Sequence, residues 1–259
     1  KKRSNIASKG HSTRGQFDQY DFCRVKRDKR DTVMPLSIGV LLSGSGTNLQ
    51  AIIDRIEEGT LDARIVIVIS NIPGAKGLDW ARKHGLQTRV IPHGDSASRQ
   101  EHDAALIACL RQFGVQAVCL AGYMRLLSPD FVQAFPRRIL NIHPSLLPAF
   151  KGVHAQQQAA DYGVLISGAT VHFVDQHLDH GPIIIQGALA VNPAESGDDL
   201  AARILAIEHR IYPQAIQWLA RDRLKIDQGR VVPGLQGLEG RFPAIQDQFC
   251  ISPGLETGF

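Results

Sequence analysis

Short apolar runs alternate with amphipathic segments along much of this chain, beginning at residue 36. The runs expected to form strands are LSIGVLL (36–42), ARIVIVIS (63–70), QTRVIP (87–92), QAVCLAG (116–122) and RRILNIH (137–143). Several are apolar at consecutive positions, so both faces of the strand must be buried, and the segments between them have helical spacing. A mostly parallel sheet with helices on both faces meets both requirements, and the sequence therefore predicts an α/β fold.

The second half of the chain departs from this alternation. GATVHFVD (168–175) and PIIIQGALAV (182–191) predict a hairpin-like pair of strands around a polar loop, and a long helix opened by Ser196 follows over 196–222. Beyond residue 232 the sequence is rich in Gly and Pro and has no periodicity. We therefore expect a basic, disordered extension over 1–34, one folded domain over 35–232 and a flexible tail over 233–259.

The net charge of +4 is unevenly distributed. Residues 1–33 carry ten Lys or Arg against four Asp, whereas the rest of the chain carries 19 basic and 21 acidic residues. The folded part is thus nearly neutral, and its charge gives no argument for nucleic-acid binding. A nucleic-acid-binding arm is one interpretation of the head. A disordered extension, or sequence upstream of a start at Met34, is the interpretation we favour.

The sequence also indicates the compartment. No apolar run approaches the roughly 18 residues of a membrane span, and the first 35 residues lack the apolar core of a signal peptide. The four cysteines are Cys23, Cys109, Cys119 and Cys250, and none forms a CxxC pair. This usage is typical of a reducing cytoplasm, and it predicts neither a disulfide framework nor a zinc site.

The turn SGSGTNLQ (43–50) lies between the first expected strand and the first expected helix. Its glycines allow close backbone approach, and the free N–H groups at a helix start form an anion site. The turn lacks the GK[ST] of a P-loop, and Leu49 stands where a dinucleotide fingerprint needs its third glycine. Two interpretations remain: a monophosphate cradle formed by Gly46, Thr47 and Asn48, or a tight turn that needs glycine for packing alone.

The loop NIHPSLLPAFKG (141–152) begins at the end of an expected strand, where α/β sheets bind ligands. Asn141 and His143 alternate along this strand, so their side chains project to the same side. An amide can donate to a developing oxyanion, and an imidazole can move a proton near neutral pH. The alternative is a hydrogen-bonded polar pair at a strand end with no catalytic role.

The loop DQHLDHGP (175–182) supplies two carboxylates, Asp175 and Asp179. One of them, placed beside His143, would hold the imidazole in its charged form and fix its ring. Three histidines raise a metal site as a rival: His172 in the expected strand before the loop, and His177 and His180 in the loop itself. Their spacing matches no HExxH or Cys/His pattern, so we expect solvated loop histidines and no bound metal.

Five motifs occur in the order SGSGTNLQAII, LAGYMRLLSP, LNIHPSLLPAFKG, GATVHFVD with LDHGPII, and EHRIYP. With them, the chain over roughly residues 36–230 resembles the phosphoribosylglycinamide formyltransferase family. The resemblance implies a Rossmann-like formyltransferase fold with a mostly parallel, twisted, seven-stranded sheet, and it makes residues 35–232 the catalytic domain. It also implies transfer of a formyl group from 10-formyltetrahydrofolate to the amine of glycinamide ribonucleotide, in de novo purine biosynthesis.

The resemblance assigns roles to individual residues. Catalysis falls to Asn141, His143 and Asp179. The glycinamide ribonucleotide site comprises Gly46, Thr47, Asn48, Leu205, Ala206, Ile207 and Glu208, although pattern alone makes Glu208 an ordinary solvated helix carboxylate. The 10-formyltetrahydrofolate site comprises Arg99, Met124, Arg125, Leu126, Leu127, Asn141, Asp175, Gln176, His177, Leu178 and Asp179.

In the implied reaction the amine attacks the formyl carbon, and Asn141 with protonated His143 stabilises the tetrahedral oxyanion. Asp179 keeps His143 cationic, and water near Asp179 carries the amine proton to the departing folate nitrogen. The formyl donor is already activated, so we expect neither metal nor ATP. The expected partners are small molecules, with no nucleic acid and no membrane, and the expected assembly is a monomer or homodimer.

Three other functions compete with this one. A 10-formyltetrahydrofolate hydrolase shares the Asn, His and Asp and uses water as acceptor, but it normally carries an N-terminal regulatory domain, and the head here is short and polar. Methionyl-tRNA formyltransferase would need a C-terminal RNA-binding domain, for which the segment after residue 232 is small. A non-catalytic nucleic-acid-binding protein rests on the basic head alone. EHRIYP favours the transformylase.

Overall fold

The structure is a computed structural model of the chain, and it describes residues 34–233, 244–246 and 249–259. Of the basic extension predicted over 1–34, only Met34 falls within the described residues. Residues 34–259 belong to one compact unit.

One mixed sheet runs through this unit. The strands are β1 (Leu36–Leu42), β2 (Ala63–Ser70), β3 (Thr88–Val90), β4 (Ala117–Leu120), β5 (Ile139–His143), β6 (Ile166–Phe173), β7 (Ile183–Ala190), β8 (Leu224–Asp227), β9 (Arg230–Pro233), β10 (Ala244–Gln246) and β11 (Phe249–Ser252). Within the described residues nine of them form the sheet, in the order β10-β11-β7-β6-β5-β4-β1-β2-β3, and β8 and β9 form a separate hairpin. β1 to β5 pair in parallel, and only β6 and β11 run against the other strands. The predicted α/β fold with a mostly parallel sheet is confirmed.

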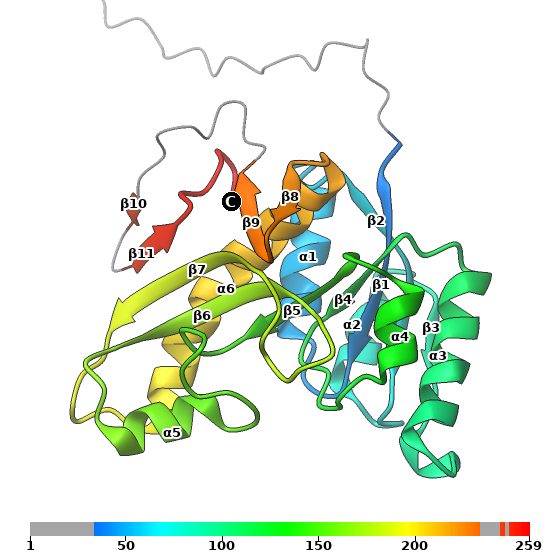
Figure 1. Cartoon of the computed structure of the whole chain (residues 1–259), viewed down its shortest axis with the longest axis horizontal. Coiled ribbons are helices and arrows are strands. Elements are labelled where there is room, and N and C mark those ends of the chain that lie inside the picture. Colours follow the sequence, from blue (N-terminus) through cyan, green and yellow to red (C-terminus); the bar gives the residue numbers. More distant parts are fainter. Residues whose placement is uncertain (1–33, 234–243, 247–248) are drawn as a thin grey trace, which may run out of the picture. The chain divides into compact units, whose positions relative to one another are not determined.

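Four helices cover one face of this sheet. They are α1 (Thr47–Glu57), α2 (Lys76–Lys83), α5 (Ala155–Tyr162) and α6 (Gly197–Ala220). Apolar side chains such as Ile52, Leu78 and Ile211 pack with Val40 and Leu140 of the strands into the larger core. α6 lies against α1 and α5 and crosses β6 and β7 (Figure 1). No helix in the described part of the chain, α6 with its 24 residues included, is long and apolar enough to cross a membrane.

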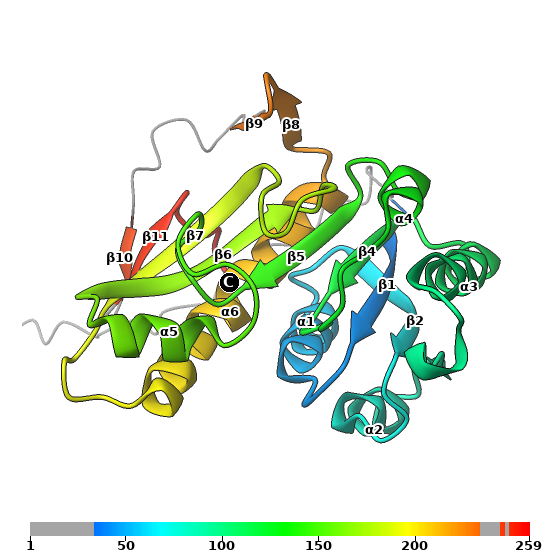
Figure 2. The ribbon, with the colours of Figure 1, turned by 60° about the horizontal axis from the view of Figure 1, so that its bottom comes forward.

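The opposite face is only partly covered by helices. After a short 3-10 turn η1 (His93–Asp95), α3 (Arg99–Gln112) and α4 (Pro129–Ala134) pack Leu106, Leu110 and Phe131 against Ile67 and Val118 in a second core. On the same face, the loops that follow β5 and β6 lie over these two strands (Figure 2). The loops, rather than a helix, therefore enclose the ends of β5 and β6.

Serine side chains begin three of the helices. Ser98 caps α3, Ser128 caps α4, and Ser196 forms a capping box with Asp199 at the start of α6. Each such cap contributes on the order of 1 kcal/mol to the stability of its helix. The predicted cap at Ser196 is thus present.

The C-terminal segment differs from the flexible tail expected over 233–259. β11 pairs antiparallel with β7, with Ile251 opposite Gly187, and β10 pairs with β11. Ile251 is buried, and Glu256 accepts a hydrogen bond from the indole N–H of Trp218 in α6 at 3.2 Å. These two strands extend the implied seven-stranded sheet to nine within the described residues. Residues 234–243 and 247–248 of the expected tail lie outside them.

Candidate active site

Two neighbouring strands place polar side chains on one face of the sheet. Asn141 and His143 lie two residues apart on β5, and Asn141 is paired with His172 of β6. The intervening Leu140 and Ile142 point into the larger core. Because side chains alternate along a strand, Asn141, His143 and His172 project from the face that α3 and α4 partly cover.

Asp179 comes from the loop between β6 and β7, which folds back onto these strands. Its Oδ2 lies 3.4 Å from Nδ1 of His143, and its Oδ1 lies 3.5 Å from Nδ2 of Asn141. The backbone N–H of Gly152 donates to Oδ2 at 2.8 Å. Asp179 itself has a φ of 45°, a strained conformation for a non-glycine residue and one that clusters at functional sites. The structure thus brings together the three residues predicted to be catalytic.

His172 is a fourth member of this group. Sequence analysis considered it only as a rival metal ligand and did not place it beside Asn141. Its Nδ1 lies 2.8 Å from the carbonyl oxygen of Phe173, and its Nε2 lies 3.2 Å from Nδ2 of Asn141 and 3.8 Å from Oδ1 of Asp179. Because a carbonyl only accepts, Nδ1 carries the proton and Nε2 accepts from the amide. Burial lowers the pKa of His172, although the Phe173 carbonyl and the Asp179 charge act against this, so the ring is neutral at pH 7.

The loop after β5 is fastened to the sheet at several points. The carbonyl oxygen of Phe150 lies 2.8 Å from Nε2 of His143, so this nitrogen carries a proton and Nδ1 faces Asp179. The hydroxyl of Thr170 in β6 donates to the carbonyl of Ser145 at 2.7 Å, and it accepts a hydrogen bond from the backbone N–H of Leu147 at 3.1 Å. These bonds fix the orientation of the His143 ring.

The turn after β1 packs closely against the start of α2. Gly46, at the start of α1, has a φ of 78°, and a Cβ added there would meet the Cα of Gly77 at 2.4 Å. Glycine is therefore required at position 46 for packing, as one interpretation of SGSGTN holds. The backbone N–H groups at the start of α1 have no partner within the helix, as the phosphate interpretation requires. The two interpretations do not exclude each other.

Asn48 and Glu208 join α1 to α6. Nδ2 of Asn48 donates to Oε2 of Glu208 at 2.6 Å, and both side chains are buried. Glu208 is therefore not the solvated carboxylate that its pattern indicates. Burial raises the pKa of Glu208 to about 7, although the hydrogen bond from Asn48 acts to lower it. Oδ1 of Asn48 is inaccessible and has no hydrogen-bond partner among the described residues.

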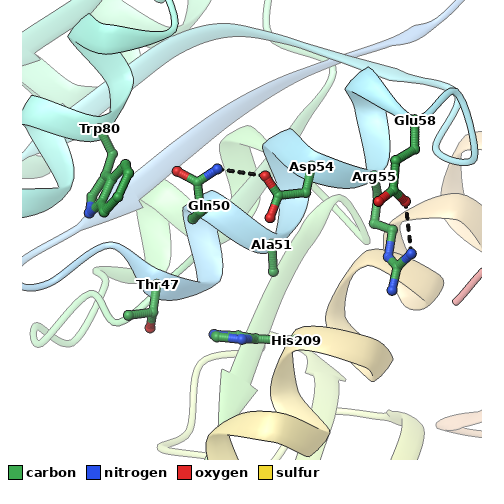
Figure 3. Close-up of a pocket in the computed structure, with 8 residues that line it drawn as sticks. All are labelled: Thr47, Gln50, Ala51, Asp54, Arg55, Glu58, Trp80 and His209. Atoms are coloured by element: carbon green, nitrogen blue, oxygen red, sulfur yellow. Dashed lines mark hydrogen bonds and ion pairs between the residues drawn. The ribbon is translucent and has the colours of Figure 1, made fainter.

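A cavity of about 260 Å³ opens beside these two helices (Figure 3). Thr47 and Asp54 line it from α1, and His209, which follows Glu208, lines it from α6. Nε2 of His209 is inaccessible and has no hydrogen-bond partner in the described part of the chain. Burial lowers the pKa of His209, with the charge of Asp54 acting against it. The sequence reasoning missed His209, whose one signal was its place in EHRIYP.

The other residues predicted to meet the ribonucleotide precede Glu208 in α6. Ile207 is fully buried, and a Cβ added at Gly187 of β7 would meet its Cγ2 at 2.2 Å. Its side chain therefore packs in the core, so a contact of Ile207 with the ribonucleotide falls to its backbone. Ala206 is exposed and Leu205 is half-buried.

Met124 to Leu127, predicted for the formyl donor, lie in the loop after β4. The backbone N–H of Met124 donates to Oγ of Ser43 at 3.0 Å, and this hydroxyl also donates to the side chain of Asn71 at 2.6 Å. Ser43, which sequence reasoning did not single out, thus ties together the ends of β1, β2 and β4. Met124 is 69% exposed and Leu126 51% exposed, so apolar side chains at this edge are accessible to a ligand.

The other residues predicted for the donor site do not all face one accessible surface. Leu127 packs against the second core, and Nε of Arg125 is buried with no hydrogen-bond partner among the described residues. Arg99 is exposed at the first position of α3, and no described contact joins it to the other predicted residues. The loop ends at Ser128, whose backbone N–H donates to the buried Asp103 at 2.5 Å.

The exposed part of the loop after β6 lies next to a second cavity, of about 430 Å³. Asp175, Gln176 and His177 line this cavity, opposite residues of α4. Oδ2 of Asp175 lies 2.8 Å from Nδ1 of His180, and its Oδ1 accepts the backbone N–H of His177 at 2.8 Å. The two histidines are exposed, as expected, but they converge on one carboxylate.

The formyl transferase family model matches residues 36–216. The chain is 43% identical over 191 residues to the phosphoribosylglycinamide formyltransferase of Escherichia coli (strain K12). The matched region covers 74% of this chain and 90% of that protein. It is 45% identical over 195 residues to the trifunctional purine biosynthetic protein adenosine-3 of Bos taurus, covering 75% of this chain but spanning only 19% of that relative's length. The crystal structure of glycinamide ribonucleotide transformylase 1 from Symbiobacterium toebii matches with a TM-score of 0.76 and 51% identity, over 77% of this chain and 94% of that chain.

Proposed function

The chain belongs to the formyl transferase family, and on that basis we propose that it transfers a formyl group from 10-formyltetrahydrofolate to the amine of glycinamide ribonucleotide. The products are formylglycinamide ribonucleotide and tetrahydrofolate, in a step of de novo purine biosynthesis. The observation that carries this proposal is the convergence of the Asn141 amide, the His143 imidazole and the Asp179 carboxylate at contacts of 3.4 and 3.5 Å. The similarity to a single-function relative over 90% of its length supports the choice of acceptor.

Negative charge develops on the formyl oxygen when the uncharged amine attacks the formyl carbon. One hydrogen of the Asn141 amide is held by Nε2 of His172 at 3.2 Å, and the other meets Asp179 at 3.5 Å, the outer limit of a hydrogen bond. In our proposal the developing oxyanion takes over this second hydrogen. A donor of this kind contributes roughly 10²- to 10³-fold to turnover.

His143 supplies positive charge in this proposal. Because the Phe150 carbonyl holds one proton on Nε2, the second proton of the charged ring lies on Nδ1, which faces Asp179. The protonated ring stabilises the oxyanion, and the carboxylate balances the positive charge of the ring. The bond between the formyl carbon and the folate nitrogen then breaks, and the amine proton passes through water near Asp179 to that nitrogen.

The two substrates approach from different sides of this group. We assign the ribonucleotide phosphate to the start of α1 at Gly46, Thr47 and Asn48, where His209 lines the adjoining cavity. Glu208, bonded to Asn48, fixes the inner end of this site. We assign the donor to the loop of Met124 to Leu127 and to residues 175–179, where exposed apolar side chains and the 430 Å³ cavity lie.

The remaining assignments complete the proposal. The formyl donor is already activated, so the proposed reaction uses neither metal nor ATP. We assign small-molecule substrates, no nucleic acid and no membrane, a cytoplasmic location and a monomeric or homodimeric assembly. Residues 35–232 are the proposed catalytic domain, and residues 1–34 are an extension outside it. Deletion of residues 1–33 should leave formyl transfer intact.

Release of tetrahydrofolate, measured with and without glycinamide ribonucleotide, tests this function. Release that requires the amine supports formyl transfer. Release at the same rate without the amine overturns it in favour of 10-formyltetrahydrofolate hydrolase, which uses water as acceptor.

A further inference from the structure

We propose that Asp175, His177 and His180 form a binding site for a divalent transition-metal ion, with Zn²⁺ as the best match, and that an ion bound there opposes binding of the formyl donor. The first part is independent of the proposed function, and the second part rests on it. No step of the proposed reaction uses this site.

The geometry of the three side chains supports a metal site. One ligand atom from each lies within 4.8 Å of the others, and this is the one such group of His, Cys, Asp or Glu in the described part of the chain. Asp175 stands between the two rings, with Oδ2 2.8 Å from Nδ1 of His180 and Oδ1 3.8 Å from Nδ1 of His177. A tetrahedral Zn²⁺ about 2.1 Å from each ligand holds the ligand atoms about 3.4 Å apart. The two distances to the Asp175 oxygens lie on either side of that value, and the three ligand atoms all lie within 4.8 Å of one another, so side-chain rotations can complete the site.

The ligand chemistry narrows the choice of ion. Two imidazoles and one carboxylate suit Zn²⁺, Cu²⁺, Ni²⁺ or Co²⁺, whereas Mg²⁺ and Ca²⁺ prefer oxygen ligands alone. The side chains are well exposed, 75% for His177, 60% for His180 and 34% for Asp175. The remaining coordination positions therefore face solvent. Such an ion exchanges readily, unlike an ion in a closed four-ligand structural site.

The site overlaps the stretch that we assign to the formyl donor. Asp175 and His177 line the 430 Å³ cavity beside α4. An ion that draws both side chains toward His180 removes them from the cavity and fixes the loop, including Asp179, which lies between His177 and His180 in sequence. Metal and donor therefore compete for the same side chains, and linkage requires each to weaken binding of the other.

Titration of the full chain with Co²⁺, followed by its visible absorption and by displacement with Zn²⁺, tests the site without any need for activity. His84→Ala is the matched control, because Nδ1 of His84 lies 2.8 Å from Glu57 in an exposed pair that has no third ligand among the described residues. We expect wild type and His84→Ala to bind one equivalent equally well. His180→Ala and His177→Ala should each weaken binding at least tenfold, since loss of a mere hydrogen-bond partner of a ligand already costs roughly 10- to 100-fold.

Equal Co²⁺ affinity in wild type and His180→Ala overturns the site, as does a loss in His84→Ala that matches the loss in His180→Ala. Steady-state kinetics test the competition. Zn²⁺ should raise the apparent KM for 10-formyltetrahydrofolate in wild type and His84→Ala without changing kcat, EDTA should reverse this, and His180→Ala should need at least about tenfold more Zn²⁺. Inhibition that lowers kcat at unchanged KM overturns the competition. A chain that binds Co²⁺ as expected but transfers no formyl group overturns the proposed function and leaves the metal site standing.

Discussion

The loop between β6 and β7 holds two aspartates four residues apart, and each is flanked by two histidines. The buried group is Asp179 with His143 and His172, and the exposed group is Asp175 with His177 and His180. The side chain of Asp179 is 9% exposed and that of Asp175 34% exposed. The rings of the buried group come from two strands, whereas those of the exposed group come from the loop itself.

The two groups differ in how firmly the surrounding structure holds the histidine rings. In the buried group, backbone carbonyls of Phe150 and Phe173 fix the proton on one nitrogen of each ring, and the strands fix the ring positions. In the exposed group the contacts described for the rings are with Asp175 and with each other, so the rings can rearrange around an ion. The same set of one aspartate and two histidines therefore suits proton transfer in one place and metal binding in the other, because the surrounding structure sets the chemistry.

Loss of a ring should separate the two groups most strongly. His143→Ala should lower kcat/KM roughly 10²- to 10⁴-fold, because it removes both proton transfer and charge stabilisation. His180→Ala, assayed with EDTA, should change kcat/KM less than about threefold, since exposed substitutions usually stay within about 0.5 kcal/mol. Circular dichroism should show that both variants remain folded. Comparable losses in the two variants would remove the distinction between the groups.

A buried carboxylate without a histidine sharpens the comparison. Burial raises the pKa of Glu208 from 4.5 to about 7, so the folded state holds this proton more tightly than the unfolded state. The stability gained from it is complete below pH 4.5 and is lost as pH rises through 7. Glu208→Gln keeps an oxygen that accepts from Asn48 but has no proton to lose. As pH rises from 4.5 to 8, the free energy of unfolding of the variant should increase by about 3 kcal/mol relative to that of wild type.

Urea unfolding at pH 5 and pH 8 measures this difference for Glu208→Gln. Glu58→Gln, which replaces a carboxylate with 52% side-chain exposure on the same side of the sheet, is the control and should follow wild type. Parallel pH profiles of Glu208→Gln and wild type would show that burial does not control this group.

A change in the shared loop should affect both groups together. A Cβ added at Gly181 would meet the carbonyl oxygen of Phe173 at 2.0 Å. Gly181→Ala should therefore shift the loop and destabilise the protein by about 1–3 kcal/mol. It should also lower both formyl transfer and Co²⁺ affinity, measured on one preparation. Gly94→Ala, where a Cβ meets nothing within 4 Å, is the control. Loss of only one of the two properties would show that the groups respond separately.

The smallest effect is expected at Asp175. Burial acts to raise the pKa of Asp175, but hydrogen bonds from His180 and from the backbone N–H of His177, with the charges of both rings, lower it below its usual value. The stability that results is present above the unfolded value of 3.8 and is lost as pH falls through the folded pKa, the opposite direction to Glu208. With EDTA present, Asp175→Asn should lower the free energy of unfolding, measured with urea at pH 7, by less than about 1 kcal/mol. A larger cost, or one that grows between pH 5 and pH 3, would contradict this.

Local pattern was sufficient for most of the fold. β1, β2 and β4 could be recognised because each buries both faces and so reads as a continuous apolar run. β11 could not, since its four residues are held by pairing with β7 and by contacts of the following residues with α6. Such contacts leave no periodicity in a segment of that length.

The site was predictable to the same extent. Asn141 and His143 share a face because of the two-residue period of a strand, which the sequence contains. His172 joins them through the register of β5 against β6, which spacing does not encode. Glu208 is buried where α6 meets Asn48, which lies 160 residues away in sequence. The pattern of its own helix does not indicate this burial. Pattern alone therefore located Asn141 and His143, whose placement depends on near neighbours. It gave His172 no place beside them, and Glu208 entered the predicted site only through the family resemblance.

The pairing of β11 with β7 also bears on how the protein behaves in concentrated solution. Without β11, the residues Gln186 to Leu189 of β7 would present unpaired backbone N–H and C=O groups along an open sheet edge, a template for strands of other molecules. With it, the outermost strand is β10, which has three residues and offers little length for such pairing. Removal of residues 249–259 would thus leave Asn141, His143 and Asp179 in the chain yet expose it to aggregation, so solubility rather than turnover would be lost first.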